Sequence, residues 1–302
     1  MGFFLGIDGG GTKTECVLAD ESGAVVARST GPGTNLRRTS AAELRATLAQ
    51  CLDALRQQAG LARMECDAVC GGFAGAGQVE ARRSAEEVLK DLLRPKLLLV
   101  VGDMEVALEA AVGAGPGVVL IAGTGSIAFG RNATGKTARA GGKGFEEGDE
   151  GSGFDIGRRA LEASKRFPDS LLAGQVGQAG ASSASPAGLA NLVPAVSRAA
   201  RSGDKAAHDI LTKAASELAK LTVVVLQELD LLRAEAAVAT SGGVFAESEE
   251  ILAGVRAHIL AAAPRARIEP LEVSPAEGAV RMAQRLWLEK QGSGSRPGER
   301  GG

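Results

Sequence analysis

From Phe3 to Ala19 the chain reads Phe-Phe-Leu-Gly-Ile-Asp-Gly-Gly-Gly-Thr-Lys-Thr-Glu-Cys-Val-Leu-Ala. Two short apolar runs, residues 3–8 and 14–19, flank a turn made of three glycines and a threonine. A third apolar run, Ala24–Ala27, follows the polar turn Asp20–Gly23. Short apolar runs separated by turn residues are typical of neighbouring strands, so the start of the chain predicts three strands in a meander.

Helices and strands alternate after this meander. Ser40 and Glu43 have the spacing of a capping box, leucines then recur at helical intervals, and Gly60 ends the predicted helix. A strand, a helix, a strand and a helix are predicted next, at residues 67–70, 78–93, 96–101 and 104–113.

The second half of the chain repeats this order. Strands are predicted at Gly117–Ala122, Ile127–Arg131 and Thr137–Ala140. The elements predicted after them are helices near 153–166, 186–201 and 205–232, a strand at 236–240, a helix near 247–262, a strand at 266–270 and a last helix. That last helix has Ser274 as N-cap, Pro275 as its first residue and Glu277 as capping-box glutamate.

Two copies of one order of elements predict two similar α/β domains. The first is expected to cover residues 1–113 and to be completed by the last helix, 275–289, and the second to cover residues 114–274. Residues 174–185 are rich in glycine, serine and alanine, so we expect an exposed loop there. Residues 290–302 are polar and glycine-rich, which predicts a disordered tail.

The composition excludes several classes of protein. The chain has 302 residues, 34 lysines and arginines against 36 aspartates and glutamates, 45% apolar residues and 3% aromatic residues. A disordered chain would be less apolar and more highly charged, and most nucleic-acid binders are basic and carry aromatic side chains for stacking. The apolar start is too short for a membrane span and has no basic flank typical of a signal peptide. We therefore expect a cytoplasmic protein with neither nucleic acid nor membrane as its partner.

The four cysteines are expected to be reduced and buried. Cys16, Cys51, Cys66 and Cys70 all lie within apolar patterns, where a thiol packs as a small apolar group. Cys66 and Cys70 have no histidine near them in the sequence, so core packing is favoured over a metal site.

Glycine is unusually frequent, at 42 residues, and two glycine patterns match nucleotide-binding motifs in the wrong context. Gly130–Thr137 matches the P-loop pattern, but a P-loop leads into a helix, and the glycine-rich residues 141–144 oppose one. Asn132–Gly135 favours a hairpin turn instead. Gly123–Ala128 has the spacing of a dinucleotide-binding turn, yet it leads into a predicted strand.

A third glycine pattern is defined by its position. Gly9–Thr12 and Gly123–Ser126 each lie between the first and second predicted strands of their half, and each contains a hydroxyl residue. Glycines let successive N–H groups converge on an anion, and a threonine or serine hydroxyl adds a donor. If the two domains face each other, these hairpins would bind one phosphate chain from opposite sides. Two unrelated tight turns are the alternative.

Six motifs follow one another in the order of a known family: Ile7–Thr14, Gly33–Asn35, Gly102–Asp103, Gly123–Ser126, Gly141–Gly144 leading to Gly148–Ser152, and Ser241–Phe245. Through them the chain resembles, from about residue 3 to residue 289, the N-acetylglucosamine kinases and BadF/BcrA-type ATPases of the hexokinase, actin and Hsp70 superfamily. The resemblance implies an α/β fold of two ribonuclease H-like domains of the actin-like ATPase type, with an active-site cleft between them. It also implies ATP and Mg²⁺ as cofactors and a small sugar as substrate.

The resemblance implies roles on the nucleotide side. Asp8 would help to hold Mg²⁺ through water, since Mg²⁺ prefers carboxylate and water oxygens. The residues implied to contact the phosphates of ATP are Gly10, Gly11, Thr12, Thr124 and Gly125, and those beside the adenosine are Gly242 and Gly243. The simpler alternatives are turn capping for Asp8, hydroxyls that satisfy the local backbone, and a helix-start turn for the last two glycines.

Asp103 follows an apolar strand, at the edge where ligands bind in α/β sheets. Phosphoryl transfer to a hydroxyl needs an acceptor for the proton of the attacking oxygen, and an aspartate suits that task. The resemblance makes Asp103 the catalytic base and a sugar contact. A plain N-cap for the helix beginning at Met104 is the alternative.

On the sugar side the resemblance implies contacts from Asn35, Gly141, Gly142 and Asp149. Asparagine can both donate to and accept from sugar hydroxyls. A turn asparagine and a helix-start aspartate are the alternatives for Asn35 and Asp149.

The sequence departs from the family beside these glycines. Lys143 stands where many relatives have tryptophan, and Glu146 and Glu147 stand where they have apolar residues. With Asp149 and Glu150 these glutamates suggest the hypothesis of a cationic amino sugar such as glucosamine, against the alternative of an exposed acidic face. Glu150 by itself is assigned no role.

The leading expectation is therefore an ATP-dependent amino-sugar kinase with N-acetylglucosamine or glucosamine as acceptor, and a homodimer is an open option for its assembly. One alternative is an ATPase of the same superfamily that activates a redox partner through an iron–sulfur cluster shared between subunits; this needs interface cysteines, and none follows Cys70. A sugar-sensing regulator is another, although no DNA-reading helices flank the two domains. A zinc-containing sugar kinase is disfavoured because His208 and His258 accompany no cysteine cluster.

Overall fold

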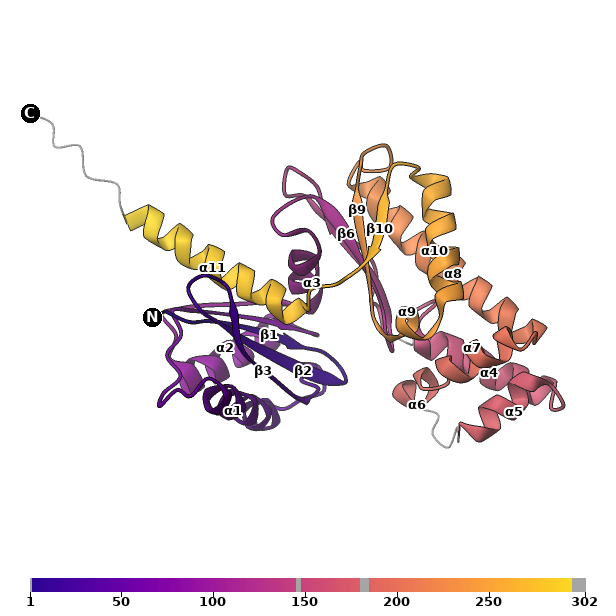
Figure 1. The fold of residues 1–302 in the computed structure, drawn as a ribbon, viewed down its shortest axis with the longest axis horizontal. Coiled ribbons are helices and arrows are strands. Elements are labelled where there is room, and N and C mark those ends of the chain that lie inside the picture. Colours follow the sequence, from indigo (N-terminus) through magenta and orange to yellow (C-terminus); the bar gives the residue numbers. More distant parts are fainter. Residues whose placement is uncertain (1, 145–147, 180–184, 295–302) are drawn as a thin grey trace, which may run out of the picture. The chain divides into compact units, whose positions relative to one another are not determined.

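The computed structural model describes residues 2–144, 148–179 and 185–294 of the chain. It divides into two compact units, one formed by Met1–Ala114 with Glu272–Gly302 and the other by Gly115–Leu271. Each unit contains one mixed five-stranded sheet (Figure 1).

The first sheet consists of β1 (Phe4–Gly9), β2 (Lys13–Ala19), β3 (Val25–Pro32), β4 (Ala68–Phe73) and β5 (Leu97–Gly102). Its order is β3-β2-β1-β4-β5, with β1, β2 and β3 antiparallel and β1, β4 and β5 parallel. The predicted meander is confirmed, and β3 continues beyond the predicted run to Pro32. This extension carries the chain to the edge at which β1 ends, because Lys13 pairs with Pro32.

Four helices cover the two faces of this sheet: α1 (Ala41–Gln58), α2 (Val79–Leu93), α3 (Asp103–Val112) and α11 (Pro275–Gly294). Leu5, Ile7 and Leu18 point to the face that packs against α1 and α2. Phe4 and Val17 point to the opposite face, where they pack with residues of α3 and α11. Figure 1 shows α11 on one side of the sheet and α1 on the other. The alternation of side chains along a strand produces these two layers. The predicted capping box is present, since the side chains and backbones of Ser40 and Glu43 bond reciprocally.

Two glycines permit the close approach of α11. A Cβ atom built on Gly6 of β1 would lie 2.1 Å from the carbonyl oxygen of Ala276, and one on Gly278 would lie 2.1 Å from that of Val106 in α3. Real Cβ atoms do not approach backbone oxygens so closely, so the packing of α11 on β1 and α3 requires glycine at both positions. The C-terminal helix is thus part of the core of the first unit.

The second sheet consists of β6 (Gly117–Ala122), β7 (Ser126–Arg131), β8 (Thr137–Gly141), β9 (Ala237–Ser241) and β10 (Arg267–Pro270). Its order, β8-β7-β6-β9-β10, has the same pattern as the first sheet, with three antiparallel strands followed by two parallel additions. The repeated order of elements predicted from the sequence is therefore present in the structure.

Seven helices complete the second unit as described: α4 (Gly153–Arg166), α5 (Leu171–Gln178), α6 (Pro186–Ala190), α7 (Val193–Arg201), α8 (Lys205–Glu228), α9 (Gly243–Glu247) and α10 (Glu249–Ala262). The long helix α8 packs on β6, β7 and β8 and against α10. In residues 2–144, 148–179 and 185–294, no helix combines the length and apolar composition needed to cross a membrane.

The predicted exposed loop at residues 174–185 is wrong in its first part, because Gly174–Gln178 belong to α5. The Ser170 side chain caps this helix by accepting from the N–H of Ala173 at 3.1 Å, and Leu172 and Val176 are buried. Capping and two buried side chains one turn apart outweigh the low helix propensity of the glycines. Residues 180–184 of the predicted loop lie outside the described residues.

Two further boundaries differ from those predicted. The helix predicted at 186–201 is divided into α6 and α7, because Pro194 has no N–H for the carbonyl of Ala190 and its ring would crowd that group. The predicted tail from residue 290 is also corrected, since α11 continues through the helix-forming residues Glu289, Lys290 and Gln291 to Gly294. Residues 295–302 lie outside the described part of the chain.

Candidate functional site

The hairpin between β1 and β2 exposes unpaired hydrogen-bond donors. Its backbone is held by the N–H of Gly10, which donates to the carbonyl of Lys13, and by the carbonyl of Gly10, which accepts from Thr34, both at 3.0 Å. Gly11 and Thr12 are exposed. Their two N–H groups and the Thr12 hydroxyl have no partner among the described residues. Such a run of free donors is suited to an anion.

The hairpin between β6 and β7 in the second unit presents the same set of donors. The N–H of Gly123 donates to the carbonyl of Gly125 at 2.9 Å, and the carbonyls of Gly123 and Thr124 accept from Gly153 and Phe154 at the start of α4. In the described parts of the chain, no group accepts from the N–H groups of Thr124 and Gly125 or from the Thr124 hydroxyl. The alternative of hydroxyls that satisfy the local backbone is therefore wrong for both Thr12 and Thr124.

The two misleading glycine patterns have the structures predicted for them. Asn132 Oδ1 accepts from the N–H groups of Thr134 and Lys136 at 3.1 and 3.0 Å, which closes a hairpin turn between β7 and β8. Gly130–Thr137 leads into β8, and Gly123–Ala128 leads into β7. Neither segment has the strand–turn–helix context of a phosphate-binding or dinucleotide-binding motif.

Asp8 lies at the carboxyl end of β1. Gly9, Phe73 and Gly102 are in register across β1, β4 and β5, so Asp8 and Asp103 lie at the same edge of the sheet. The pKa of Asp8 is raised to about 7, first by burial and then by the charges of Asp103 and Glu15. The structure thus brings together two carboxyl groups that the sequence placed 95 positions apart.

The Asp8 carboxyl group fits a role in holding Mg²⁺. A carboxylate crowded by two other negative charges is stabilised by a divalent cation, which would lower its pKa again. Mg²⁺ in phosphoryl-transfer sites usually keeps several waters and takes only one or two carboxylates. Across the described residues, no group of three or more histidine, cysteine, aspartate or glutamate side chains is placed to hold a metal ion.

Asp103 is the first residue of α3, and the residue before it occupies the N-cap position. Gly102 is the N-cap residue, and Glu105 Oε1 accepts from its N–H at 3.0 Å. Asp103 Oδ1 accepts from the N–H of Met104 at 3.0 Å, and burial raises the pKa of its carboxyl group against the effect of this bond. Asp103 therefore does not occupy the N-cap position, although its carboxylate accepts from one N–H of the first turn. Glu105 was not among the predicted residues, although the Gly-x-x-Glu spacing after a strand could have indicated it.

Asn35 lies in a loop attached to the same edge. The N–H of Thr34 donates to the carbonyl of Gly10 at 3.0 Å, and the N–H of Leu36 donates to that of Ala74 at 2.8 Å. Thr34 is buried, with its hydroxyl 2.8 Å from that of Thr14. Asn35 Oδ1 accepts from the N–H of Arg37 at 3.0 Å, so Asn35 is a turn asparagine, and its amide NH₂ group has no hydrogen-bond partner among the described residues.

Asp149 lies beneath the second hairpin. Its Oδ1 accepts from the N–H of Ser126 at 3.0 Å, and a Cβ atom on Gly125 would lie 2.8 Å from its Oδ2. Burial raises the pKa of the Asp149 carboxyl group, and the charge of Glu150 adds to this. Ser152 caps α4, so the alternative of a helix-start aspartate is wrong for Asp149.

The remaining predicted glycines of the second unit surround the same hairpin. Gly141 and Gly142 have φ values of +76° and +67°, and the N–H of Gly142 donates to the carbonyl of Ser126 at 2.8 Å. Gly242, at φ +109°, lies where a Cβ atom would be 2.3 Å from the carbonyl oxygen of Ala122, and Gly243 beside it is exposed. Only glycine fits at Gly141, Gly142 and Gly242 without strain, whereas a Cβ atom on Gly243 would meet nothing within 4 Å. Glu146 and Glu147 lie outside the described residues.

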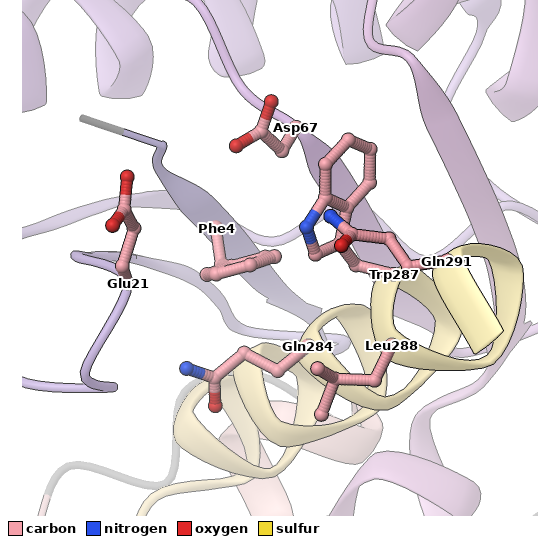
Figure 2. Close-up of a pocket in the computed structure, with 7 residues that line it drawn as sticks. All are labelled: Phe4, Glu21, Asp67, Gln284, Trp287, Leu288 and Gln291. Carbon is pink, nitrogen blue, oxygen red and sulfur yellow. The ribbon is translucent and has the colours of Figure 1, made fainter. Parts of the chain in front are cut away.

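A pocket of about 490 Å³ in the first unit lies away from these residues (Figure 2). It is lined by Phe4, Glu21, Asp67, Gln284, Trp287, Leu288 and Gln291. Phe4 begins β1 and Asp67 precedes β4, whereas Asp8 and Asp103 lie at the opposite ends of their strands. Ligands of α/β sheets bind at the carboxyl ends, so this pocket is not the candidate site.

The cysteines occupy core positions. Cys16, Cys51, Cys66 and Cys70 are free and buried, as predicted. An iron–sulfur cluster shared between subunits needs thiolates at a surface, so the redox-activator alternative has no support from their placement.

The comparisons with known proteins agree with this arrangement. The model of the BadF/BadG/BcrA/BcrD ATPase family matches residues 5–283. An N-acetylmuramic acid/N-acetylglucosamine kinase from Clostridium acetobutylicum is 30% identical over 302 residues, covering 94% of this chain and 99% of that protein. The crystal structure of a protein described as a putative N-acetylglucosamine kinase from Chromobacterium violaceum superposes with a TM-score of 0.74 at 27% identity, covering 95% of this chain and 99% of the other.

A second such crystal structure, from Porphyromonas gingivalis, also has a TM-score of 0.74, at 21% identity, and covers 94% of this chain and 99% of the other. The two mixed sheets with their helices therefore form the actin-like ATPase fold that the resemblance implied. By sequence over most of its length and by fold, the chain belongs to the BadF/BadG/BcrA/BcrD ATPase family.

Proposed function

We propose that this protein is an ATP-dependent amino-sugar kinase that transfers the γ-phosphate of ATP to a hydroxyl of N-acetylglucosamine or N-acetylmuramic acid. The observation that carries the proposal is the pair of equivalent hairpins, each with two N–H groups and a threonine hydroxyl that have no partner in the part of the chain that the structure describes. The name of the Clostridium acetobutylicum relative supports the choice of substrates.

The free donors of both hairpins bind phosphate oxygens of ATP in this proposal. Gly11 and Thr12 supply one set, and Thr124 and Gly125 supply the other. The exposed Gly242 and Gly243 leave room for the adenosine against their backbone. Mg²⁺, held with the help of Asp8, supplies positive charge that neutralises the phosphates during transfer.

Asp103 acts as the general base. Its Oδ1 accepts from the N–H of Met104, which orients the carboxylate and leaves Oδ2 to accept the proton of the attacking sugar hydroxyl. As that O–H bond breaks, the sugar oxygen bonds to the γ-phosphorus and the bond from γ-phosphorus to the β–γ bridging oxygen breaks, releasing ADP. Burial raises the pKa of Asp103, which improves a carboxylate as a base near neutral pH.

In this proposal the acetylated sugars are better substrates than glucosamine. The hypothesis of a cationic sugar depends on four acidic residues, of which Glu146 and Glu147 lie outside the described residues and Asp149 is engaged by Ser126. The Asn35 NH₂ group can donate to a sugar oxygen in either case.

An ADP-release assay with a panel of hexoses, glucosamine, N-acetylglucosamine and N-acetylmuramic acid tests the proposal. We expect the two acetylated sugars to give the highest kcat/KM, and Asp103→Asn to lower kcat by about 10²- to 10⁴-fold while nucleotide affinity is kept. Asp91→Asn, a change at an exposed aspartate of α2, is the matched control. ADP release independent of any sugar would contradict the proposal, and full turnover by Asp103→Asn would contradict the assignment of the base.

A further inference from the structure

We propose that Arg37 binds a carboxylate carried by the sugar and thereby sets the preference for N-acetylmuramic acid over N-acetylglucosamine. This inference rests on the proposed function and assigns a specificity residue within its sugar site. The two sugars differ by a lactyl ether, whose carboxylate is ionised at neutral pH, so a carboxylate-binding side chain would act on one sugar only.

The backbone places Arg37 beside Asn35. A Cβ atom built on Gly75 would lie 3.0 Å from Arg37 Cγ and 3.2 Å from Asn35 Oδ1, so the arginine stem crosses Gly75 next to the asparagine. Gly75 has a φ of +89° and follows β4, whose carboxyl end lies between those of β1 and β5. The start of the arginine side chain is thus at the edge of the sheet that carries Asp8 and Asp103.

Hydrogen bonds hold this loop in one conformation. The N–H of Arg37 donates to Asn35 Oδ1, and those of Arg38 and Thr39 donate to the carbonyl of Asn35 at 2.9 and 3.0 Å. The N–H of Leu36 connects the loop to Ala74. A fixed backbone reduces the entropy lost when a long side chain is ordered on a ligand, which favours a binding role for the arginine.

The acidic side chains at this edge favour a basic side chain nearby for an anionic sugar. Asp8 and Asp103 lie at the carboxyl ends of β1 and β5, so a further carboxylate arriving with the substrate would be repelled by them. Lys13 is less suited to binding the sugar carboxylate, because its Nζ lies 3.5 Å from Glu15 Oε2 and is already paired with that carboxylate.

The Arg37 side chain is free to take this role. It is exposed, and within residues 2–144, 148–179 and 185–294 it pairs with no carboxylate. A guanidinium presents a planar fork of donors that matches a carboxylate in a bidentate contact.

The test compares kcat/KM for N-acetylmuramic acid with that for N-acetylglucosamine in wild-type protein and in Arg37→Gln, Arg37→Lys and Arg38→Gln. We expect Arg37→Gln to lower the ratio of the two kcat/KM values by about 10- to 100-fold, the usual loss when a charged hydrogen bond is removed. Arg37→Lys keeps a charge without the planar fork, so it should lose less. Arg38→Gln removes the same charge from the adjacent residue and should leave the ratio unchanged.

Each failure has a distinct signature. An equal fall for both sugars, an equal effect of Arg38→Gln, or a rise in KM for ATP alone would overturn the role of Arg37 while leaving the kinase in place. Wild-type protein that phosphorylates N-acetylglucosamine but not N-acetylmuramic acid would do the same. Wild-type protein that phosphorylates neither sugar would overturn the proposed function and this inference with it.

Discussion

The carboxyl groups of Asp8 and Asp103 lie at the ends of β1 and β5, and the charge of Asp103 helps to raise the pKa of Asp8 to about 7. Gly72 of β4, which is in register with Asp8, contributes no side chain between them and lies against Val106 of α3. The first turn of α3, with Asp103, therefore approaches the end of β1. A pair of carboxyl groups in this environment is stabilised by a proton or by a cation.

The first prediction concerns stability and pH. The pKa of Asp8 is higher in the folded protein than in the unfolded chain, so between about pH 4 and pH 7 the folded state holds a proton that the unfolded state has lost. The contribution of Asp8 to stability is therefore fully present below pH 4 and is lost as pH rises through 7. In Asp8→Asn this titration is absent, so without Mg²⁺ the variant should gain on the wild type as pH rises, by as much as about 4 kcal/mol at pH 8.

Urea unfolding of both proteins at pH 5, 6, 7 and 8 measures this difference. Asp53→Asn, at an exposed position of α1, is the control and should run parallel to the wild type. Parallel curves for Asp8→Asn as well would show that Asp8 titrates normally in the folded protein.

The second prediction concerns the free hydroxyls of the two hairpins. Thr12→Val and Thr124→Val remove groups without a described partner, so the free energy of unfolding should be nearly unchanged. Each variant should raise KM for ATP by about 5- to 20-fold, since one hydrogen bond to a charged phosphate is lost.

Thr14→Val provides the contrast. The Thr14 hydroxyl donates to the carbonyl of Pro32 at 2.7 Å and contacts buried Thr34, so its removal should cost about 1–3 kcal/mol of stability. Loss of stability without a change in KM for Thr12→Val and Thr124→Val would assign those hydroxyls to the fold.

The third prediction concerns Gly125. An alanine there places its Cβ 2.8 Å from Asp149 Oδ2, so the carboxylate must move and lose its bond to the N–H of Ser126. We expect Gly125→Ala to cost about 1–3 kcal/mol and to lower kcat/KM for ATP. Gly123→Ala, in the same hairpin, meets nothing within 4 Å and should keep its stability within about 0.5 kcal/mol. Equal thermal unfolding of the two variants would refute this account.

The fourth prediction concerns the ion pair between α3 and α11. Arg285 donates to both oxygens of Glu109 at 2.5 and 3.0 Å, and Glu109 is 2% exposed whereas the Arg285 side chain is 36% exposed. Removal of the arginine leaves a buried charge, so Arg285→Met should cost about 3–5 kcal/mol. Glu109→Gln should cost less, because Arg285 can turn to water, and the double variant should be more stable than Arg285→Met. Chemical unfolding of the three variants measures these differences.

Much of the architecture could be predicted from local sequence patterns. The meander, the capping box of α1 and the two equivalent hairpins follow from apolar runs, cap spacings and glycine turns, which act over a few residues. The misjudged segments are those where the pattern was weak. Only two residues of α5, Leu172 and Val176, are buried. Two apolar positions among glycines give too weak a helical pattern to predict the helix from sequence. Pro194 marks the break between α6 and α7, because a proline within a helical pattern ends or kinks the helix.

The candidate residues were also found by motif, but their partners were not. Glu105 accepts from the N–H of Gly102, the N-cap residue of α3, and Asp149 lies against Gly125 from 24 positions away. The sequence by itself determined which segments become strands, helices and glycine hairpins, because these depend on neighbours along the chain. The tertiary structure alone decided that Asp8 and Asp103 lie at one edge of a sheet and that Arg37 lies against Gly75. It also decided that the hydroxyls of Thr12 and Thr124 have no partner among the described residues. The reason is that burial, the distance between charges and the hydrogen-bond partner of each donor depend on strand order and on packing between residues far apart in the chain.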